Sequence, residues 1–153
     1  MTIRPLQSGD LSALQRVLHG TDLFPADLLP ELTAGYLSGD GEPELWFTLC
    51  DGCEPTGFCY AAPEMLTEGT WNMRAIAVLP AHQARGGGSA LVAHLETELA
   101  HQGARIVIAD TSGVVAFAPV RAFYRRNGYD EEARIRDFWA AGDDKVTFRK
   151  SLI

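Results

Sequence analysis

The chain has 153 residues, of which 46% are apolar and 22% charged, and this length is typical of one domain. Such a chain can bury a continuous core without disulfide bonds or a structural metal, and its composition is not that of a disordered protein. With 13 Lys and Arg against 20 Asp and Glu, the net charge is −7, so nucleic acid and anionic membrane surfaces are disfavoured as partners. A cationic small molecule suits this charge better.

No apolar run approaches the roughly 20 residues that span a bilayer, and the first ten residues lack the apolar block of a signal peptide. We therefore expect a cytoplasmic protein. Its three cysteines cannot all pair with one another, and a reducing compartment keeps them as thiols. Cys50 and Cys53 have the spacing of a metal or redox pair, but no second ligand pair follows, so we expect no metal. Their segment is better explained as a tight turn around Asp51-Gly52 between two strands.

The N-terminal half begins with a short strand over residues 2–5. Leucines at helical spacing then predict a helix that starts at Ser8 or Asp10 and stops at Gly20. Prolines and glycines interrupt residues 21–41, so we expect any helix there to be short or broken and the segment to form a mobile flap. A hairpin over residues 45–62 follows.

The C-terminal half continues with a strand over residues 71–79 and an amphipathic helix over Ser89–Gln102. The apolar run from Arg105 to Asp110 predicts a central strand that is buried on both faces. Pro119 opens a short helix that ends at Asn127-Gly128. Two last strands, at about 129–138 and 145–150, complete an α/β layer with a mixed sheet.

Three consecutive glycines, Gly86, Gly87 and Gly88, lie between the strand that ends near Leu79 and the helix that starts near Ser89. Without side chains, the backbone can approach a ligand closely, and the free N–H groups of the helix start suit a phosphate. The segment is neither a P-loop nor a standard Rossmann fingerprint, because it lacks the lysine of the first and follows a hairpin. An ordinary flexible loop and an NAD or ATP site remain as alternatives.

The segment Val78–Gly88 reads VLPAHQARGGG and resembles the acetyl-coenzyme A signature of the GNAT N-acetyltransferase superfamily. Gln83, Gly86 and Gly88 occupy the positions of its core, which is Gln or Arg, two residues, Gly, one residue, then Gly or Ala. A second segment, FYRRNGY at residues 123–129, is similar to the family's helix end, FY, two or three residues, GF. Both segments occur in the family's order, separated by a helix and a strand.

The resemblance implies one α/β (α+β) N-acetyltransferase domain over residues 1–153, with a mixed, mostly antiparallel sheet of about seven strands and four helices on its two faces. It implies an acyltransferase (EC 2.3.1.-) that moves an acetyl group from acetyl-coenzyme A, the acyl-donor cosubstrate, to a primary amine of a small molecule or peptide by direct attack. A catalytically silent sensor or structural module that binds acetyl-coenzyme A is the alternative. Family members commonly pair as homodimers, which makes a dimer the default expectation.

Carried over to this chain, the resemblance assigns the pyrophosphate to the backbone N–H groups of residues 83–89 and the pantetheine arm to the end of the preceding strand. The family often has Asn seven residues before the helix tyrosine, but this chain has Phe117 there, so Thr111 or Ser112 is expected to substitute. A bulky side chain at Gly86 or Gly88 is expected to block the cofactor and leave the fold intact. The expected cofactor-binding residues are Ile76, Val78, Gln83, Ala84, Arg85, Gly86, Gly87, Gly88, Ser89, Thr111 and Ser112.

The resemblance also implies the catalytic groups. Tyr124 matches the tyrosine that protonates the departing thiolate, although a tyrosine there can also simply cover the edge of the core. Many family members carry a glutamate base on the fourth strand, but this chain has Asn72 at that position, which cannot take a proton. Glu68, just before the strand, and Asp110, at the end of the next one, are the candidate bases, together with a chain of water molecules. Both carboxylates can also be ordinary strand-end residues.

Two regions are candidates for the acceptor site. Residues 21–44 contain six acidic residues and no Lys or Arg, which either attracts a protonated amine or only keeps the chain in solution. Near the last hairpin, the candidates for lining an acceptor pocket are Trp71, Arg134, Arg136, Phe138 and Trp139. Arg134 and Arg136 share a face of the strand, where they either bind the carboxylate of an amino acid or only face solvent.

Overall fold

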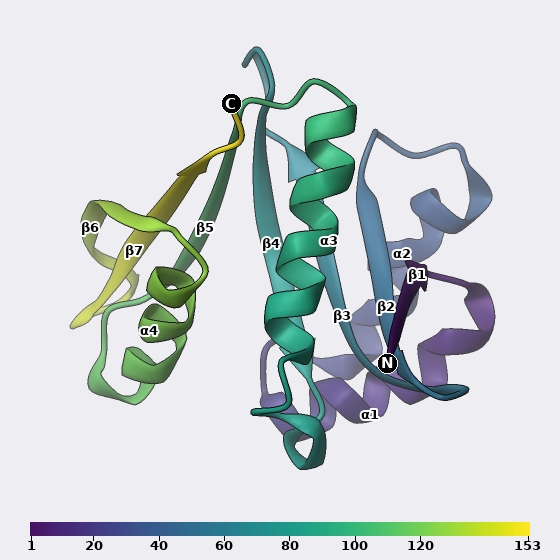
Figure 1. Ribbon diagram of the computed structural model, residues 1–153. Coiled ribbons are helices and arrows are strands. Elements are labelled where there is room, and N and C mark those ends of the chain that lie inside the picture. Colours follow the sequence, from purple (N-terminus) through teal and green to yellow (C-terminus); the bar gives the residue numbers. More distant parts are fainter.

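The structure is a computed structural model that describes all residues, 1–153 (Figure 1). Its α-helices are α1 (Leu11–Thr21), α2 (Leu29–Ser38), α3 (Gly87–His101) and α4 (Ala118–Arg126). Its strands are β1 (Thr2–Pro5), β2 (Leu45–Asp51), β3 (Glu54–Pro63), β4 (Thr70–Val78), β5 (Ile106–Ser112), β6 (Asp130–Ala140) and β7 (Asp143–Ser151). The expected order of helices and strands is confirmed.

The seven strands form one sheet in the order β1-β2-β3-β4-β5-β7-β6. Every neighbouring pair is antiparallel except β4 and β5, which are parallel. A parallel pair needs a crossover connection, and α3 provides it. This arrangement confirms the expected mixed, mostly antiparallel sheet of seven strands with four helices.

The helices cover the two faces of the sheet, α1 and α2 behind it and α3 and α4 in front in the view of Figure 1. Apolar residues of α3, such as Leu91, Leu95 and Leu99, are fully buried against the strands. Leu14 and Leu18 of α1 are buried against Trp46 and Phe58 on the opposite face. Two apolar cores, one on each face, thus hold the sheet in place.

The segment expected to be a mobile flap contains a regular helix, so the prediction of a short or broken helix is wrong for α2, which is ten residues long. Pro30 lies in its first turn, where a missing N–H breaks no helical hydrogen bond. Gly39 ends the helix with φ +78, a conformation that glycine adopts easily. The proline and the glycine thus mark the two ends of the helix instead of interrupting it.

Strand β5 is buried on one face only, which corrects the expectation of a strand buried on both. Val107 and Ala109 are fully buried under α3 and α4, whereas Ile106, Ile108 and Asp110 remain partly exposed. Helices α1 and α2 pack against β2–β4, and the core on that face includes no residue of β5. On that face, β5 is therefore not covered by a helix.

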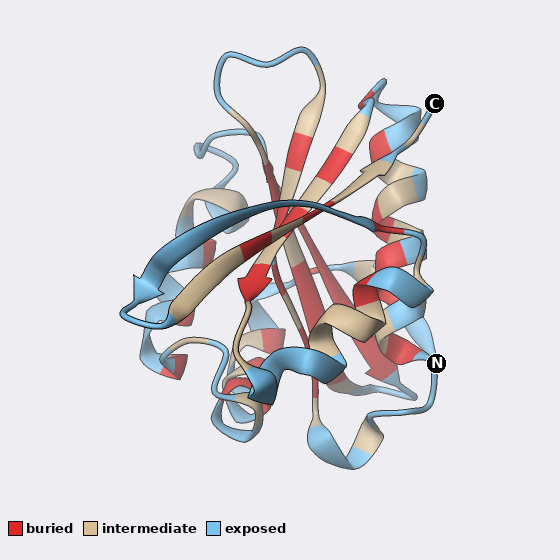
Figure 2. Ribbon diagram, turned by 90° about the vertical axis from the view of Figure 1, so that its left-hand side faces the viewer, coloured by how far each residue is buried: buried red, intermediate tan, exposed pale blue.

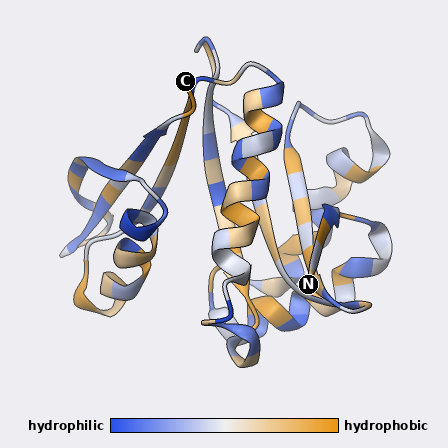
Figure 3. Ribbon diagram, viewed as in Figure 1, coloured by the Kyte–Doolittle hydropathy of each residue, from blue (hydrophilic) through white to orange (hydrophobic).

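The hairpin of β6 and β7 is longer than predicted, and its turn is Ala141-Gly142. All eleven residues of β6 are exposed, as the pale blue strand across the front of Figure 2 shows. Polar colours dominate much of this hairpin in Figure 3, whereas apolar and polar colours alternate along α3. The earlier hairpin, β2 and β3, turns at Gly52 as predicted, and the three cysteines of the chain are free thiols.

Candidate functional site

Strands β4 and β5 separate soon after they meet. Their parallel pairing covers only residues 70–72 and 106–108. Just beyond, Arg74 is an extra residue on β4, because Ala75 pairs with Tyr60 and Met73 with Ala61. A bulge of this kind bends a strand and increases its twist. From there β4 follows β3 and β5 follows β7, and a cleft of about 900 Å³ opens between them.

The segment between β4 and α3 forms the floor of this cleft. Pro80–His82 make one 3₁₀ turn, and the Gln83 side chain donates a hydrogen bond to the Val78 carbonyl at 2.9 Å. Ala84 and Gly86 then adopt left-handed conformations, with φ of +62 and +83. Helix α3 begins at Gly87, two residues earlier than expected, and the residues of its first turn line the cleft. The first N–H groups of a helix have no partner within it and suit an anion.

The three glycines have different structural roles. A β-carbon at Gly86 would meet nothing within 4 Å, but its positive φ disfavours other residues. A β-carbon at Gly87 would lie 2.7 Å from Leu49, and one at Gly88 3.1 Å from the Phe123 ring of α4. A bulky residue at Gly88 would have to displace the Phe123 ring, so we expect it to lower the stability of the fold as well as to block the cofactor.

Tyr124 lies on α4 and lines the cleft, although only 5% of the residue is exposed. Its ring stacks on Phe148 at 5.3 Å, and its hydroxyl makes no hydrogen bond within the protein. Burial, with a contribution from the negative charge of Asp110, raises the pKa of Tyr124 well above its ordinary value. The phenol therefore stays protonated at neutral pH and can serve as a proton donor.

Asp110 lines the same cleft from the end of β5. Its carboxylate accepts a hydrogen bond from the Thr147 hydroxyl at 2.6 Å and another from the Asn72 amide at 3.4 Å. The Lys145 ammonium lies 4.0 Å away. A carboxylate with these partners keeps free lone pairs toward the cleft and can accept a proton from a ligand.

Comparison with known proteins identifies the family. The model of the acetyltransferase (GNAT) family matches residues 14–129. The chain belongs to this family. Its structure superposes with a TM-score of 0.92 on a protein from Desulfovibrio desulfuricans assigned to the GNAT acetyltransferases, at 31% identity over 99% of each chain. No curated protein sequence matches the chain.

More distant structures share the GNAT fold. The ribosomal-protein-S18-alanine N-acetyltransferase of Escherichia coli has a TM-score of 0.78 at 23% identity, over 99% of this chain and 93% of that one. An aminoglycoside 6′-N-acetyltransferase, solved in complex with coenzyme A, has a TM-score of 0.76 at 17% identity, over 100% of this chain and 98% of that one. No helix of the present GNAT protein is long and apolar enough to cross a membrane.

Most of the predicted site residues of this GNAT protein come together in the cleft, but three do not. Glu68 lies in the turn before β4, whereas the first residue of β4 to line the cleft is Met73. Arg85 lies on a separate hollow of about 220 Å³ that also contacts Asp51. The Ser112 hydroxyl bonds to Asp143 of the last hairpin. The cleft contains Ile76, Val78, Gln83, Ala84, Gly86, Gly87, Gly88, Ser89, Asp110, Thr111 and Tyr124.

Sequence reasoning missed two arginines that line the cleft, Arg74 on β4 and Arg126 on α4. Arg126 lines it from the last turn of α4 and forms no ion pair. Its neighbour Arg125 instead pairs with Glu131 at 2.9 Å and lies over the Phe148 ring. Arg126 follows Phe123 at helical spacing, so the amphipathic pattern of α4 could have placed it on the cleft side. The guanidinium is available for a phosphate.

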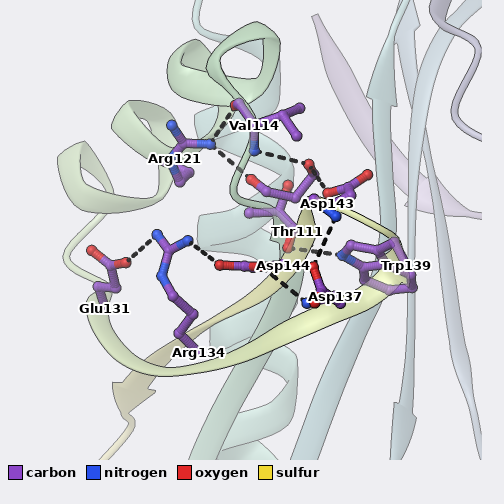
Figure 4. A network of polar contacts seen from close by, with 11 residues as sticks. Thr111, Val114, Arg121, Glu131, Arg134, Asp137, Trp139, Asp143 and Asp144 are labelled. Carbon is purple, nitrogen blue, oxygen red and sulfur yellow. Dashed lines mark hydrogen bonds and ion pairs between the residues drawn. The ribbon is translucent and has the colours of Figure 1, made fainter.

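A polar network fixes the last hairpin on the end of β5 (Figure 4). Asp144 accepts hydrogen bonds from the Arg134 side chain at 2.9 Å and from the Asp137 N–H at 3.0 Å. The Trp139 indole donates to the Thr111 carbonyl at 3.2 Å. Arg134 pairs with Asp144 and Glu131, so the carboxylate of an acceptor would have to compete with these two partners.

Proposed function

We propose that this GNAT protein, as one domain over residues 1–153, transfers an acetyl group from acetyl-coenzyme A to a primary amine by direct attack. One observation carries the proposal: the glycine-rich helix start, the edge of β4 that separates from β5, and the Tyr124 phenol all line one cleft. The family and the coenzyme A complex of the aminoglycoside acetyltransferase support it.

The residues of the cleft fit a pyrophosphate with an extended arm. The N–H groups of residues 83–89 are suited to the pyrophosphate, with Arg126 as the nearby cation. Past Asn72, the edge of β4 has no strand partner on the β5 side, so its backbone near Ile76 and Val78 can pair with the amides of a pantetheine arm. A side chain at Gly88 would compete for space with Phe123 at the mouth of this path.

Two side chains supply the proton transfers. When bound, acetyl-coenzyme A provides the acetyl thioester that the amine attacks. Asp110 takes a proton from the acceptor ammonium, which makes the nitrogen a nucleophile. Tyr124 gives its proton to the departing sulfur and recovers one from the nitrogen. It can donate because its phenol is neutral at the pH of the reaction.

The acceptor is a primary amine of a small molecule or peptide. The net charge of −7 and the acidic segment from Thr21 to Glu44, whose Asp22 lines the cleft, favour a cation. The E. coli and aminoglycoside enzymes act, by their names, on a protein alanine and on an aminoglycoside, which are both amines. These two classes are therefore the first acceptors to test.

Calorimetric titration with acetyl-coenzyme A, with NAD and ATP as controls, tests the donor. A free-thiol assay with an aminoglycoside, a peptide with N-terminal alanine and free amino acids then tests the transfer. We expect binding of acetyl-coenzyme A alone and thiol release with one amine class. Binding without thiol release from any amine would favour the sensor, and no binding would overturn the proposal.

A further inference from the structure

Two carboxylates are joined by one amide on the open face of the sheet. The Asn72 side-chain amide donates hydrogen bonds to Glu64 at 2.9 Å and to Asp110 at 3.4 Å. Glu64 directly follows β3, Asn72 lies on β4 and Asp110 on β5, so three neighbouring strands meet here. All three residues are partly exposed, and Asp110 borders the cleft. The group therefore lies between the cleft and solvent.

The charges of this group do not balance. Lys145 is the only cation that pairs with Asp110, and its ammonium also lies 4.2 Å above the Phe138 ring. Glu64 forms no ion pair, and the Asn72 amide is the only side-chain group that donates to it. The Tyr124 phenol, which faces the cleft from α4, is neutral. Arg74 lines the cleft from β4 as well, but it donates to the Tyr60 hydroxyl and pairs with neither carboxylate. Two carboxylates with one paired ammonium thus favour a cationic ligand.

We propose that Glu64 and Asp110 hold the acceptor's ammonium group between them, and that Asn72 positions both carboxylates. This inference rests on the proposed function, because it places the acceptor on the face of the sheet opposite α3 and α4. The ammonium gives one proton to Asp110, its nitrogen forms a bond to the acetyl carbon as the bond to sulfur breaks, and the sulfur takes the proton of Tyr124. Tyr124 recovers a proton from the new amide nitrogen, so the reaction releases one proton in total.

This arrangement requires the amide of Asn72, so Asn72 is more than the replacement of a glutamate base. A carboxylate at this position would remove both donated hydrogen bonds and add a third negative charge beside Glu64 and Asp110. Asn72→Asp, which has nearly the same shape, should therefore lower the rate about tenfold or more, since a hydrogen bond to a charged group is worth about that much. If Asn72 merely replaced a missing base, the same variant would raise the rate.

Two small acceptors distinguish the binding and deprotonation of an ammonium group from the acetyl transfer itself. Ethylamine is a cation at neutral pH and must be bound and deprotonated, whereas hydroxylamine is uncharged and needs neither step. Glu64→Gln should raise KM for ethylamine about tenfold, and Asp110→Asn should lower kcat about a hundredfold or more. Both variants should keep hydroxylamine rates within about twofold of the wild type. Glu68→Gln is the matched control and should change neither, because Glu68 lies in the same turn but its side chain bonds to neither Asn72 nor Asp110.

The pH profile gives a readout that a structural role would not move. With ethylamine, Asp110→Asn should regain rate as the pH rises, because neutral amine then reaches the site without a base. Equal losses with both nucleophiles, or no loss with ethylamine, would overturn the inference. If the wild type acetylated hydroxylamine but not ethylamine, the ammonium site would also be overturned. The proposed acetyl transfer would then still hold. No thiol release with either nucleophile would instead contradict the proposed function.

Discussion

A β-carbon placed on Gly88 would lie 3.1 Å from Cε2 of Phe123. The first turn of α3 and the middle of α4 therefore approach each other only because position 88 carries no side chain. The two helices flank the cleft, so this contact sets how far its two sides stand apart. Gly88, which the sequence assigns only to cofactor binding, is therefore also a packing residue.

Gly88→Ala should therefore lower the free energy of unfolding by about 1–3 kcal/mol, the usual cost of adding a group to a packed contact. Urea unfolding measures this. Gly9→Ala is the control, because a β-carbon there meets nothing within 4 Å, and it should stay within about 0.5 kcal/mol of the wild type. Equal stability of the two variants would show that Phe123 moves aside freely.

Arg126→Ala should weaken acetyl-coenzyme A binding about tenfold, because a charge-assisted bond between a guanidinium and a phosphate contributes roughly that factor. Calorimetry measures the affinity, and the loss should shrink at high salt. Arg125→Ala is the matched control, since Arg125 is paired with Glu131 and does not line the cleft. Similar losses from both variants would mean that only the net charge matters.

Tyr124→Phe should bind acetyl-coenzyme A as the wild type does and turn over about a hundredfold more slowly, if proton donation to sulfur limits the rate. Because the pKa of Tyr124 is raised by burial and by Asp110, the wild-type rate should show no loss from phenol ionisation up to about pH 10. Thiol release followed against pH tests both points. An unchanged rate in the variant would return Tyr124 to a packing role.

Asp10 should make the fold sensitive to acid. Burial by itself would raise the pKa of Asp10, but hydrogen bonds from Arg4, at 2.7 and 2.8 Å, from the Gln7 N–H and from Thr48 outweigh burial and lower it. A carboxyl with a lowered pKa in the folded state stabilises the fold above its unfolded pKa of about 4, and this stabilisation is lost as the pH falls further.

Urea unfolding at several pH values between neutral and strongly acidic conditions measures this dependence. Asp10→Asn should lose about 1–3 kcal/mol at neutral pH, because Arg4, the Gln7 N–H and Thr48 lose a charged acceptor while the Arg4 guanidinium keeps contact with water. The variant should also show a flatter stability curve below about pH 4 than the wild type. Parallel curves for the two proteins would assign the acid sensitivity to other carboxylates.

The sequence by itself determined the family, the order of helices and strands and the glycine-rich loop before α3. These features depend on residues close together in the chain: Gly86 and Gly88 at a helix start, leucines at helical spacing and turn residues between strands. Such local signals stay readable without knowledge of the fold. Even the misjudged helix α2 carried its signals, a proline at one end and a glycine at the other.

Only the tertiary structure decided which charged groups meet. Glu68 and Glu64 lie four residues apart in one turn, yet only Glu64 reaches Asn72 and, through it, Asp110. Arg85 lies outside the cleft, whereas Arg126 lines it. The bulge on β4, the short pairing of β4 with β5 and the position of α4 set these contacts. Each results from packing between residues far apart in the chain, which no local pattern encodes.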